Sequence, residues 1–243
     1  MICEAFNQCF FSLCWMSSAS YADLDIKHYK NCTGFPLVEL NGHSKLVLPI
    51  IDSYQNHQYH YSAVLDRFET EMTQCFVVDN NRKVILDTIP SLISNSCSGQ
   101  WDKKSKTPLW MADIGGGKDG VEYFPYLPSE QLKQVHKSEV SEIRQIIKSI
   151  DCQLSTYQKQ DAVELNDAAF FLYQMGYYDD SLRLLKHVIT LDPNRTVAYL
   201  NRADVYFALK NLGQARKNYM IYADQMKKSG LSNKVPLRIK QYL

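Results

Sequence analysis

The sequence lacks any apolar stretch long enough to cross a bilayer as a helix, which takes about 20 residues. The apolar run at residues 10–16 is much shorter than that. The chain also has no excess of one charge, because 27 Lys and Arg balance 26 Asp and Glu for a net charge of +1. We therefore expect no integral membrane span, and no partner such as nucleic acid that overall charge would attract.

Short signatures of catalysis are missing as well. The chain has no Gly-x-Ser-x-Gly, no His-Glu-x-x-His, no phosphate-binding Gly-Lys-Ser/Thr and no Cys-x-x-Cys pair. We expect no catalytic residue, no metal site and no cofactor. Because catalytic groups can be scattered along a chain, an enzyme or small-ligand-binding protein stays open as the alternative.

One glycine-rich segment has the spacing of a dinucleotide-binding motif, with Gly115, Gly117 and Gly120. That function requires a helix directly after the glycines, whose N-terminus would hold phosphates. Residues 121–126, followed by Pro128, instead indicate extended chain. We expect a hairpin loop here.

The first 22 residues resemble a signal peptide. The apolar run at residues 10–16 precedes small residues, and Ser20 and Ala22 stand at the two positions that signal peptidase reads. This predicts export, a mature chain beginning at Asp23, and a periplasmic or secreted protein. Glu4 and the absence of Lys or Arg before residue 27 are atypical. A buried N-terminal segment in a cytoplasmic protein is the alternative.

Cysteine usage agrees with export. Four of the seven cysteines follow residue 22, and they are Cys32, Cys75, Cys97 and Cys152. In an oxidising compartment four cysteines can form two disulfides in three pairings, among which the sequence does not choose. Four reduced, buried cysteines are the alternative.

Residues 23–127 have the pattern of a β-rich domain. Runs of β-branched and aromatic residues alternate with clusters of Gly, Asn, Asp and Pro. The segment from Asp79 to Arg82 predicts a hairpin loop, since Asn and Asp tolerate left-handed backbone. The polar segment 94–106, which contains Trp101, predicts a loop. The strand-like runs are residues 46–51, 59–65, 75–78, 84–86, 109–114 and 121–126.

Residues 128–243 have the pattern of a helical domain, so the expected fold class is α+β. Pro128 and Ser129 predict a helix start, with Ser129 as the capping residue. Apolar residues at helical spacing then predict one amphipathic helix as far as about residue 157.

From residue 162 onward the chain repeats itself at a spacing of 34 residues, as 162–195 and 196–229. Each repeat predicts a helical hairpin, in which a small residue such as Ala169 or Ala203 allows close helix approach. Pro193 ends the first hairpin, whereas Lys227 lets the second continue towards Gly230. The pairs superposed by this shift are Leu165 with Tyr199, Ala169 with Ala203, Leu172 with Tyr206, Ser181 with Ala215, Leu185 with Tyr219 and Val188 with Tyr222.

This period and this order of large and small residues resemble the tetratricopeptide repeat. The resemblance implies a groove, lined by the first helix of each hairpin, that holds a partner peptide. Two repeats are few for such an array, so residues 129–157 and 235–243 are expected to cap its ends. Only Asn201 matches the family's clamp for C-terminal carboxylates, so that activity is not implied. Carried over by position, the groove presents Val163, Asn166, Phe170, Tyr173 and Gln174, then Val197, Leu200, Asn201, Asp204 and Phe207.

These features predict non-catalytic binding of another protein or peptide outside the cytoplasm, by an adaptor, an assembly factor, or an inhibitor or immunity protein against a secreted effector. The chain's own N-terminal half is the other candidate to fill the groove. Residues 196–243 carry nine Lys and Arg against two acidic residues, which we interpret as a solvated helix surface. Attachment of this basic end to nucleic acid or to an anionic membrane surface is the alternative.

Overall fold

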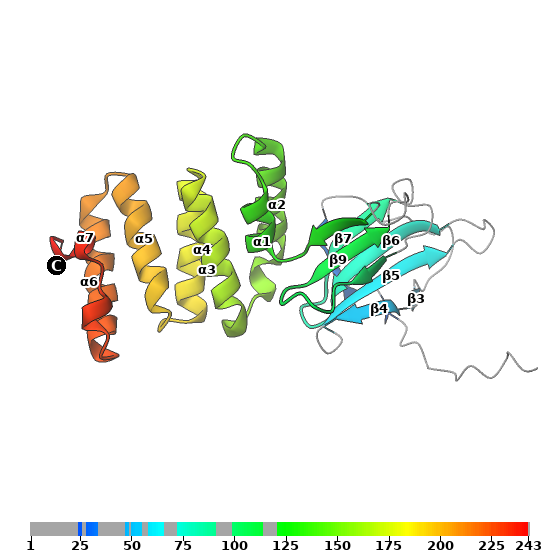
Figure 1. The fold of residues 1–243 in the computed structure, drawn as a ribbon, viewed down its shortest axis with the longest axis horizontal. Helices are drawn as coiled ribbons and strands as arrows, with labels where there is room; N and C mark the ends of the chain where they lie inside the picture. Colours follow the sequence, from blue (N-terminus) through cyan, green and yellow to red (C-terminus); the bar gives the residue numbers. More distant parts are fainter. Residues whose placement is uncertain are drawn as a thin grey trace, which may run out of the picture.

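The structure is a computed structural model, and it describes residues 24–25, 28–33, 47–48, 50–54, 58–65, 72–90, 99–113 and 121–242. The expected signal peptide at residues 1–22 lies outside the described residues, as do Cys97, Gly115, Gly117 and Gly120. The described residues combine small sheets with helices, which confirms a mixed α+β fold. Sheets and helices form two ends of one elongated arrangement (Figure 1).

Three sheets are formed within the described residues. A two-stranded sheet pairs β1 (Leu24–Asp25) with β3 (Val47–Leu48). A five-stranded sheet has the order β2-β7-β6-β5-β4, in which β2 (Lys30–Asn31) runs parallel to β7 (Val84–Pro90). Its remaining members are β6 (Met72–Asp79), β5 (Tyr59–Leu65) and β4 (Ile50–Tyr54), each antiparallel to its neighbour.

The β6–β7 hairpin confirms the turn expected at residues 79–82. The Asp79 carboxylate accepts hydrogen bonds from the backbone N–H of Arg82 at 3.0 Å and from its guanidinium at 2.6 Å. Lys83 then adopts a left-handed conformation with φ of 54°. Apolar side chains fix the strands behind this turn, since Phe76, Val77, Val78, Val84 and Ile85 are all fully buried.

The third sheet has the order β10-β9-β8, made of β8 (Gly99–Trp101), β9 (Leu109–Asp113) and β10 (Val121–Pro125). The polar loop expected at residues 94–106 is therefore wrong at Trp101, which is on a strand and buried. Its ring meets Trp110 edge to face at 5.3 Å and Tyr126 at 5.8 Å. Aromatic packing of this kind outweighs the polar sequence around it.

The strand β10 also bears on the glycine segment. It pairs antiparallel with β9, with Val121 opposite Asp113. A strand, and not a helix, therefore follows Gly120, and the helix N-terminus that a dinucleotide site needs is not there.

The single helix expected from Ser129 to about Tyr157 is wrong. Two helices form instead, α1 (Pro128–Gln134) and α2 (Val140–Gln153). Val135 is extended, with ψ of 134°, and the Glu139 carboxylate accepts the backbone N–H of His136 at 2.8 Å. This local bond stabilises the turn between the helices. Ser129 is not the cap of α1, because its hydroxyl and N–H both donate to Glu164.

Four helices follow as two consecutive hairpins. The first joins α3 (Ala162–Gln174) to α4 (Tyr178–Leu191), and the second joins α5 (Thr196–Ala208) to α6 (Leu212–Lys228). Gly176, with φ of 89°, makes the first turn, and Gly230, with φ of 70°, follows the end of α6. The hairpins stand side by side and carry the C-terminus away from the sheets (Figure 1).

Apolar contacts hold the helices together in two clusters. The larger joins α1 and α2 to the first hairpin and includes Leu132, Ile143, Ile150, Leu165, Leu172, Leu184 and Leu185. The smaller joins α5 and α6 to the C-terminal residues and includes Tyr199, Ala203, Tyr219, Val235 and Ile239. Each buried large side chain contributes roughly 1.5–3 kcal/mol, so both clusters stabilise the helical part substantially.

One disulfide links the sheets to the helices. Cys32, directly after β2, is bonded to Cys152 near the end of α2, with Cα atoms 5.5 Å apart. The bond spans 120 residues of sequence and crosses from the β part to the helical part. Of the pairings left open by the sequence, the described residues show this one.

Candidate functional site

The residues expected to line a groove share one side of α3 and α5. We call Val163, Phe170, Tyr173, Val197, Leu200, Asp204 and Phe207 the α3–α5 face. Val163, Phe170 and Phe207 are 49%, 36% and 44% exposed, although all three are large and apolar. Positions 163, 170 and 173 on α3 correspond by the 34-residue shift to 197, 204 and 207 on α5. The same side of both helices therefore presents apolar and aromatic groups to solvent.

Asn166 and Asn201 differ from this expectation because they are buried between the helices. Their side chains are linked, with the Asn201 amide donating to Asn166 Oδ1 at 3.1 Å. Asn166 in turn donates to the exposed carboxylate of Asp167 at 3.1 Å. The two asparagines thus fix α3 against α5 and support the face, and they are not open to a partner.

The C-terminal residues cover one end of the α3–α5 face. The guanidinium of Arg238, on α7 (Leu237–Lys240), donates to both carboxylate oxygens of Asp204 at 2.6 and 2.7 Å. The ring of Tyr242 meets Phe207 edge to face at 5.6 Å and stacks on Tyr219 at 5.5 Å. Tyr219 donates its hydroxyl to Asp204 at 2.6 Å.

These contacts set the electrostatics of that end of the face. Hydrogen bonds to Asp204 raise the pKa of Arg238, so the ion pair stays charged. Burial raises the pKa of Tyr219, and the neighbouring Asp204 carboxylate raises it further. Burial and Asp204 also raise the pKa of Tyr173, which lies on α3. Asp204 therefore acts on side chains of both hairpins.

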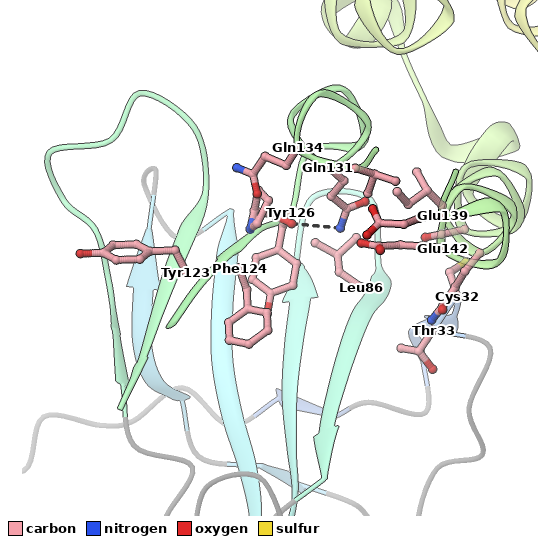
Figure 2. Close-up of a pocket in the computed structure, with 15 residues that line it drawn as sticks. Cys32, Thr33, Leu86, Tyr123, Phe124, Tyr126, Gln131, Gln134, Glu139 and Glu142 are labelled. Atoms are coloured by element: carbon pink, nitrogen blue, oxygen red, sulfur yellow. Dashed lines mark hydrogen bonds between the residues drawn. The ribbon is translucent and has the colours of Figure 1, made fainter. Parts of the chain in front are cut away.

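A separate cleft of about 500 Å³ lies between β10 and the helices α1 and α2. The charged side chains that line it are Glu139 and Glu142, and Gln131 borders it while donating to the Pro125 carbonyl at 2.9 Å. Figure 2 shows both carboxylates next to Leu86 and close to Cys32. Such a cleft suits a small ligand that carries positive charge or hydroxyl groups.

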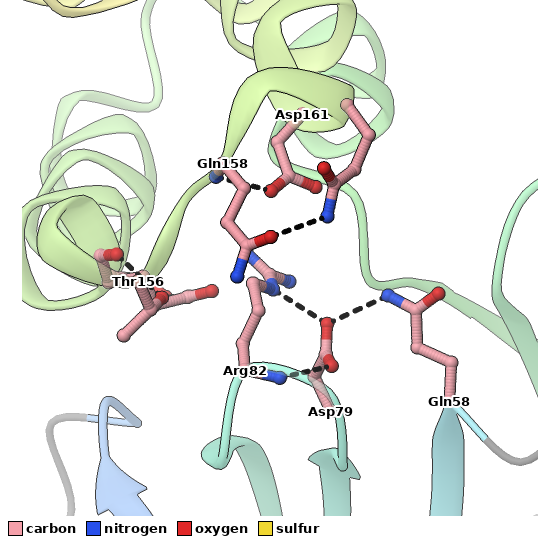
Figure 3. Close-up of polar contacts among 9 residues, drawn as sticks. Gln58, Asp79, Arg82, Thr156, Gln158 and Asp161 are labelled. Carbon is pink, nitrogen blue, oxygen red and sulfur yellow. Dashed lines mark hydrogen bonds and ion pairs between the residues drawn. The ribbon is translucent and has the colours of Figure 1, made fainter. Parts of the chain in front are cut away.

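A smaller pocket of about 310 Å³ lies where the β6–β7 turn meets α1 and α3. Arg82 stacks on Tyr157 at 4.7 Å. It is also paired with Asp79, which accepts a hydrogen bond from Gln58 at 3.1 Å (Figure 3). Burial raises the pKa of Tyr157 to about 12. This network fixes the turn against the helices.

Glu164 lies in the same pocket and joins α3 to α1. Its two oxygens accept hydrogen bonds from the Ser129 N–H at 2.7 Å and the Ser129 hydroxyl at 2.6 Å. Burial raises the pKa of Glu164, and the nearby carboxylates of Asp167 and Glu130 act in the same direction. A carboxyl group with a raised pKa marks either a functional site or a structural link between elements. The two hydrogen bonds from Ser129 make Glu164 a structural link between α3 and α1.

Sequence reasoning missed Arg238, Tyr242 and Glu164. Pro236 marks the start of the C-terminal segment, but the two predicted repeats end at residue 229, so Arg238 was not compared with positions in the repeats. A spacing of 34 also separates these two residues, as it does the equivalent positions of the repeats. That spacing was the available signal.

No protein-family model matches the chain, and a search of curated proteins found no related sequence. Among the described residues, no helix combines the length and hydrophobicity required to traverse a bilayer. The same part of the chain holds no group of three or more His, Cys, Asp or Glu side chains placed to bind a metal ion.

Proposed function

We propose that this protein binds another polypeptide through the α3–α5 face, without catalysing a reaction. The observation that carries the proposal is the row of large apolar side chains left in solvent there, Val163, Phe170 and Phe207. Exposed apolar side chains that occur together on one side of neighbouring helices are a feature of binding surfaces. A polypeptide laid along α3 and α5 would bury them.

The arrangement of the helices supports a tetratricopeptide-like array as the scaffold. Helices α3 and α5 begin at residues 162 and 196, and α4 and α6 begin at residues 178 and 212, so both pairs are offset by 34 residues. Ala169 and Ala203 are fully buried at the positions expected to allow close helix approach. In such arrays the first helices of the repeats carry the binding surface.

The Cys32–Cys152 disulfide supports a place outside the cytoplasm, because such bonds persist in oxidising compartments. We propose a periplasmic or secreted protein that acts as an adaptor, an assembly factor, or an inhibitor or immunity protein against a secreted effector. A binder that touches its target through one rigid helical face is suited to each of these tasks.

The test is partner capture from a native extract of the exported fraction. We expect the immobilised chain to retain a defined polypeptide that the double variant Val163→Ala, Phe170→Ala loses. The matched control is Leu212→Ala, Met220→Ala, which removes two apolar side chains from α6 that are at least as exposed as Val163 and Phe170. If all three proteins retain the same set, the α3–α5 face is not the binding site.

Binding of a small ligand in the cleft beside β10 is the second candidate, since Glu139 and Glu142 line it and, within the part of the chain that the structure describes, no basic side chain does. A panel of small amines and sugars would be scored by the shift they cause in melting temperature. A shift given by the native chain and lost in Glu142→Gln would favour this function. No shift with any compound would remove it.

A further inference from the structure

The C-terminal segment, residues 235–242, is held on the second hairpin by two buried apolar side chains. Val235 and Ile239 are 8% and 0% exposed and pack into the cluster formed by α5 and α6. These two apolar side chains hold the segment in place. Their partners include Tyr199, Ala203 and Tyr222, which lie away from the α3–α5 face.

Two other side chains of the segment, those of Arg238 and Tyr242, extend to the α3–α5 face. They are four residues apart. Arg238 forms two hydrogen bonds with Asp204, and Tyr242 packs against Phe207 on one side and Tyr219 on the other. Asp204 and Phe207 both belong to the α3–α5 face. The chain therefore places an arginine and an aromatic ring of its own where a partner would bind.

A partner can replace the contacts of Arg238 and Tyr242, whereas the buried side chains of Val235 and Ile239 stay in place. The side chain of Arg238 is 54% exposed, whereas that of Asp204 is 16% exposed. An incoming arginine that makes the same two hydrogen bonds leaves Asp204 paired, so it can replace Arg238 at small net cost. Asp204 is held in place by the Tyr219 hydroxyl and stays ready for an incoming guanidinium.

The charge of the α3–α5 face also suits an incoming arginine. Asp204 is the acidic residue of α5, and the exposed carboxylate of Asp167 stands on α3 beside Val163 and Phe170 in sequence. Apolar and aromatic groups lie between them. A partner segment that carries arginine and aromatic residues would match both properties.

Resting on the function proposed above, we propose that the α3–α5 face takes polypeptide segments with an arginine four residues before an aromatic residue. Arg238 and Tyr242 act as an internal competitor for the same positions. The partner's arginine replaces Arg238 on Asp204, and its ring replaces Tyr242 on Phe207, while Val235 and Ile239 keep the segment anchored.

The experiment uses random twelve-residue peptides displayed on phage, selected against three full-length proteins. These are the native chain, the double variant Arg238→Ala, Tyr242→Ala, and a triple variant that adds Asp204→Asn. We expect the double variant to enrich peptides with arginine four residues before Tyr or Phe. Synthetic copies should bind it about fivefold more tightly than the native chain, since one exposed ion-pair competitor has been removed. The triple variant should lose this preference.

A second triple variant, with Asp224→Asn in place of Asp204→Asn, is the matched control, because Asp224 is an exposed acid on α6. Melting curves establish that each variant is folded. Peptides without the arginine–aromatic spacing, or equal affinity for the native chain and the double variant, would overturn the inference. That result would leave the proposed function standing if Val163→Ala, Phe170→Ala still loses its captured partner.

Discussion

Single polar groups that are buried or half-buried connect the parts of this molecule, and the half-buried Glu164 is the clearest case. It is held in a pocket between α1 and α3, where the N–H and the hydroxyl of Ser129 both donate to its carboxylate. Its pKa is raised in the folded protein, chiefly by burial. Ionising Glu164 therefore costs more in the folded chain than in the unfolded one.

The pH dependence of stability follows from that shift. A raised folded-state pKa gives stability that is complete below the ordinary value of 4.5 and declines as pH rises through the folded-state value. We expect the free energy of unfolding of the native chain, measured by urea titration relative to Glu164→Gln, to fall as pH rises from about 4 to 7. A difference that stays constant over this range would show that Glu164 does not titrate there.

Asp79 is a second polar residue that connects the sheets to the helices. It is fully buried, and it neutralises Arg82, which stacks on Tyr157 across the junction between sheet and helices. Asp79→Ala would remove the buried ion pair with Arg82 and the bond to its backbone N–H, at a cost of roughly 3–5 kcal/mol. The measurement is the urea midpoint. Asp224→Ala is the control, because its ion pair with Lys228 is exposed and should change stability by less than about 1 kcal/mol.

At the scale of the elements, local patterns predicted strands and helices where one residue type dominated. The turn at residues 79–82, the strand at residues 59–65 and the end of α6 near Gly230 followed from short-range chemistry that the chain itself displays. The break between α1 and α2 was not predicted, although the bond from the His136 N–H to Glu139 that stabilises it is also local, because the prediction followed the apolar residues and not the polar ones. Trp101 was missed because its strand is stabilised by Trp110 and Tyr126, which are near only in space.

The disulfide acts between elements, since it joins the edge strand β2 to helix α2. β2 has only two residues paired with β7, so the covalent bond to Cys152 is a large part of what holds it. We expect the double variant Cys32→Ser, Cys152→Ser to lose about 2–4 kcal/mol of unfolding free energy. Denaturant titrations of the native chain with its disulfide intact and of the double variant measure this loss. Equal midpoints would contradict the prediction.

At the scale of the whole molecule, the sequence predicted the α+β composition and placed the exposed apolar residues of the candidate site. It did not predict that Asn166 and Asn201 bond to each other, because that depends on the distance between two hairpins. Nor did it place Arg238 on Asp204. The periodicity of apolar residues predicts which side of a helix faces solvent. The pairs of side chains that meet between two helices depend instead on how the helices pack.

The molecule as a whole should respond to loss of its end cap. Ile239 is fully buried against the second hairpin, which has no further hairpin beyond it in the described chain. We expect Ile239→Ala to cost roughly 2–5 kcal/mol and to increase amide hydrogen exchange in α5 and α6 before it does so in the sheets. Hydrogen exchange read by mass spectrometry tests this, and uniform exchange along the chain would argue against separate stability of the two ends.

The bond between Cys32 and Cys152 also constrains how the chain is made. Cys32 leaves the ribosome 120 residues before its partner, and Cys75 and Cys97 emerge in between. Nearer thiols meet first, since closing a short loop takes less entropy than closing a long one. Newly synthesised chains would then pass through mispaired bonds, and a thiol–disulfide isomerase should raise the yield of the native form.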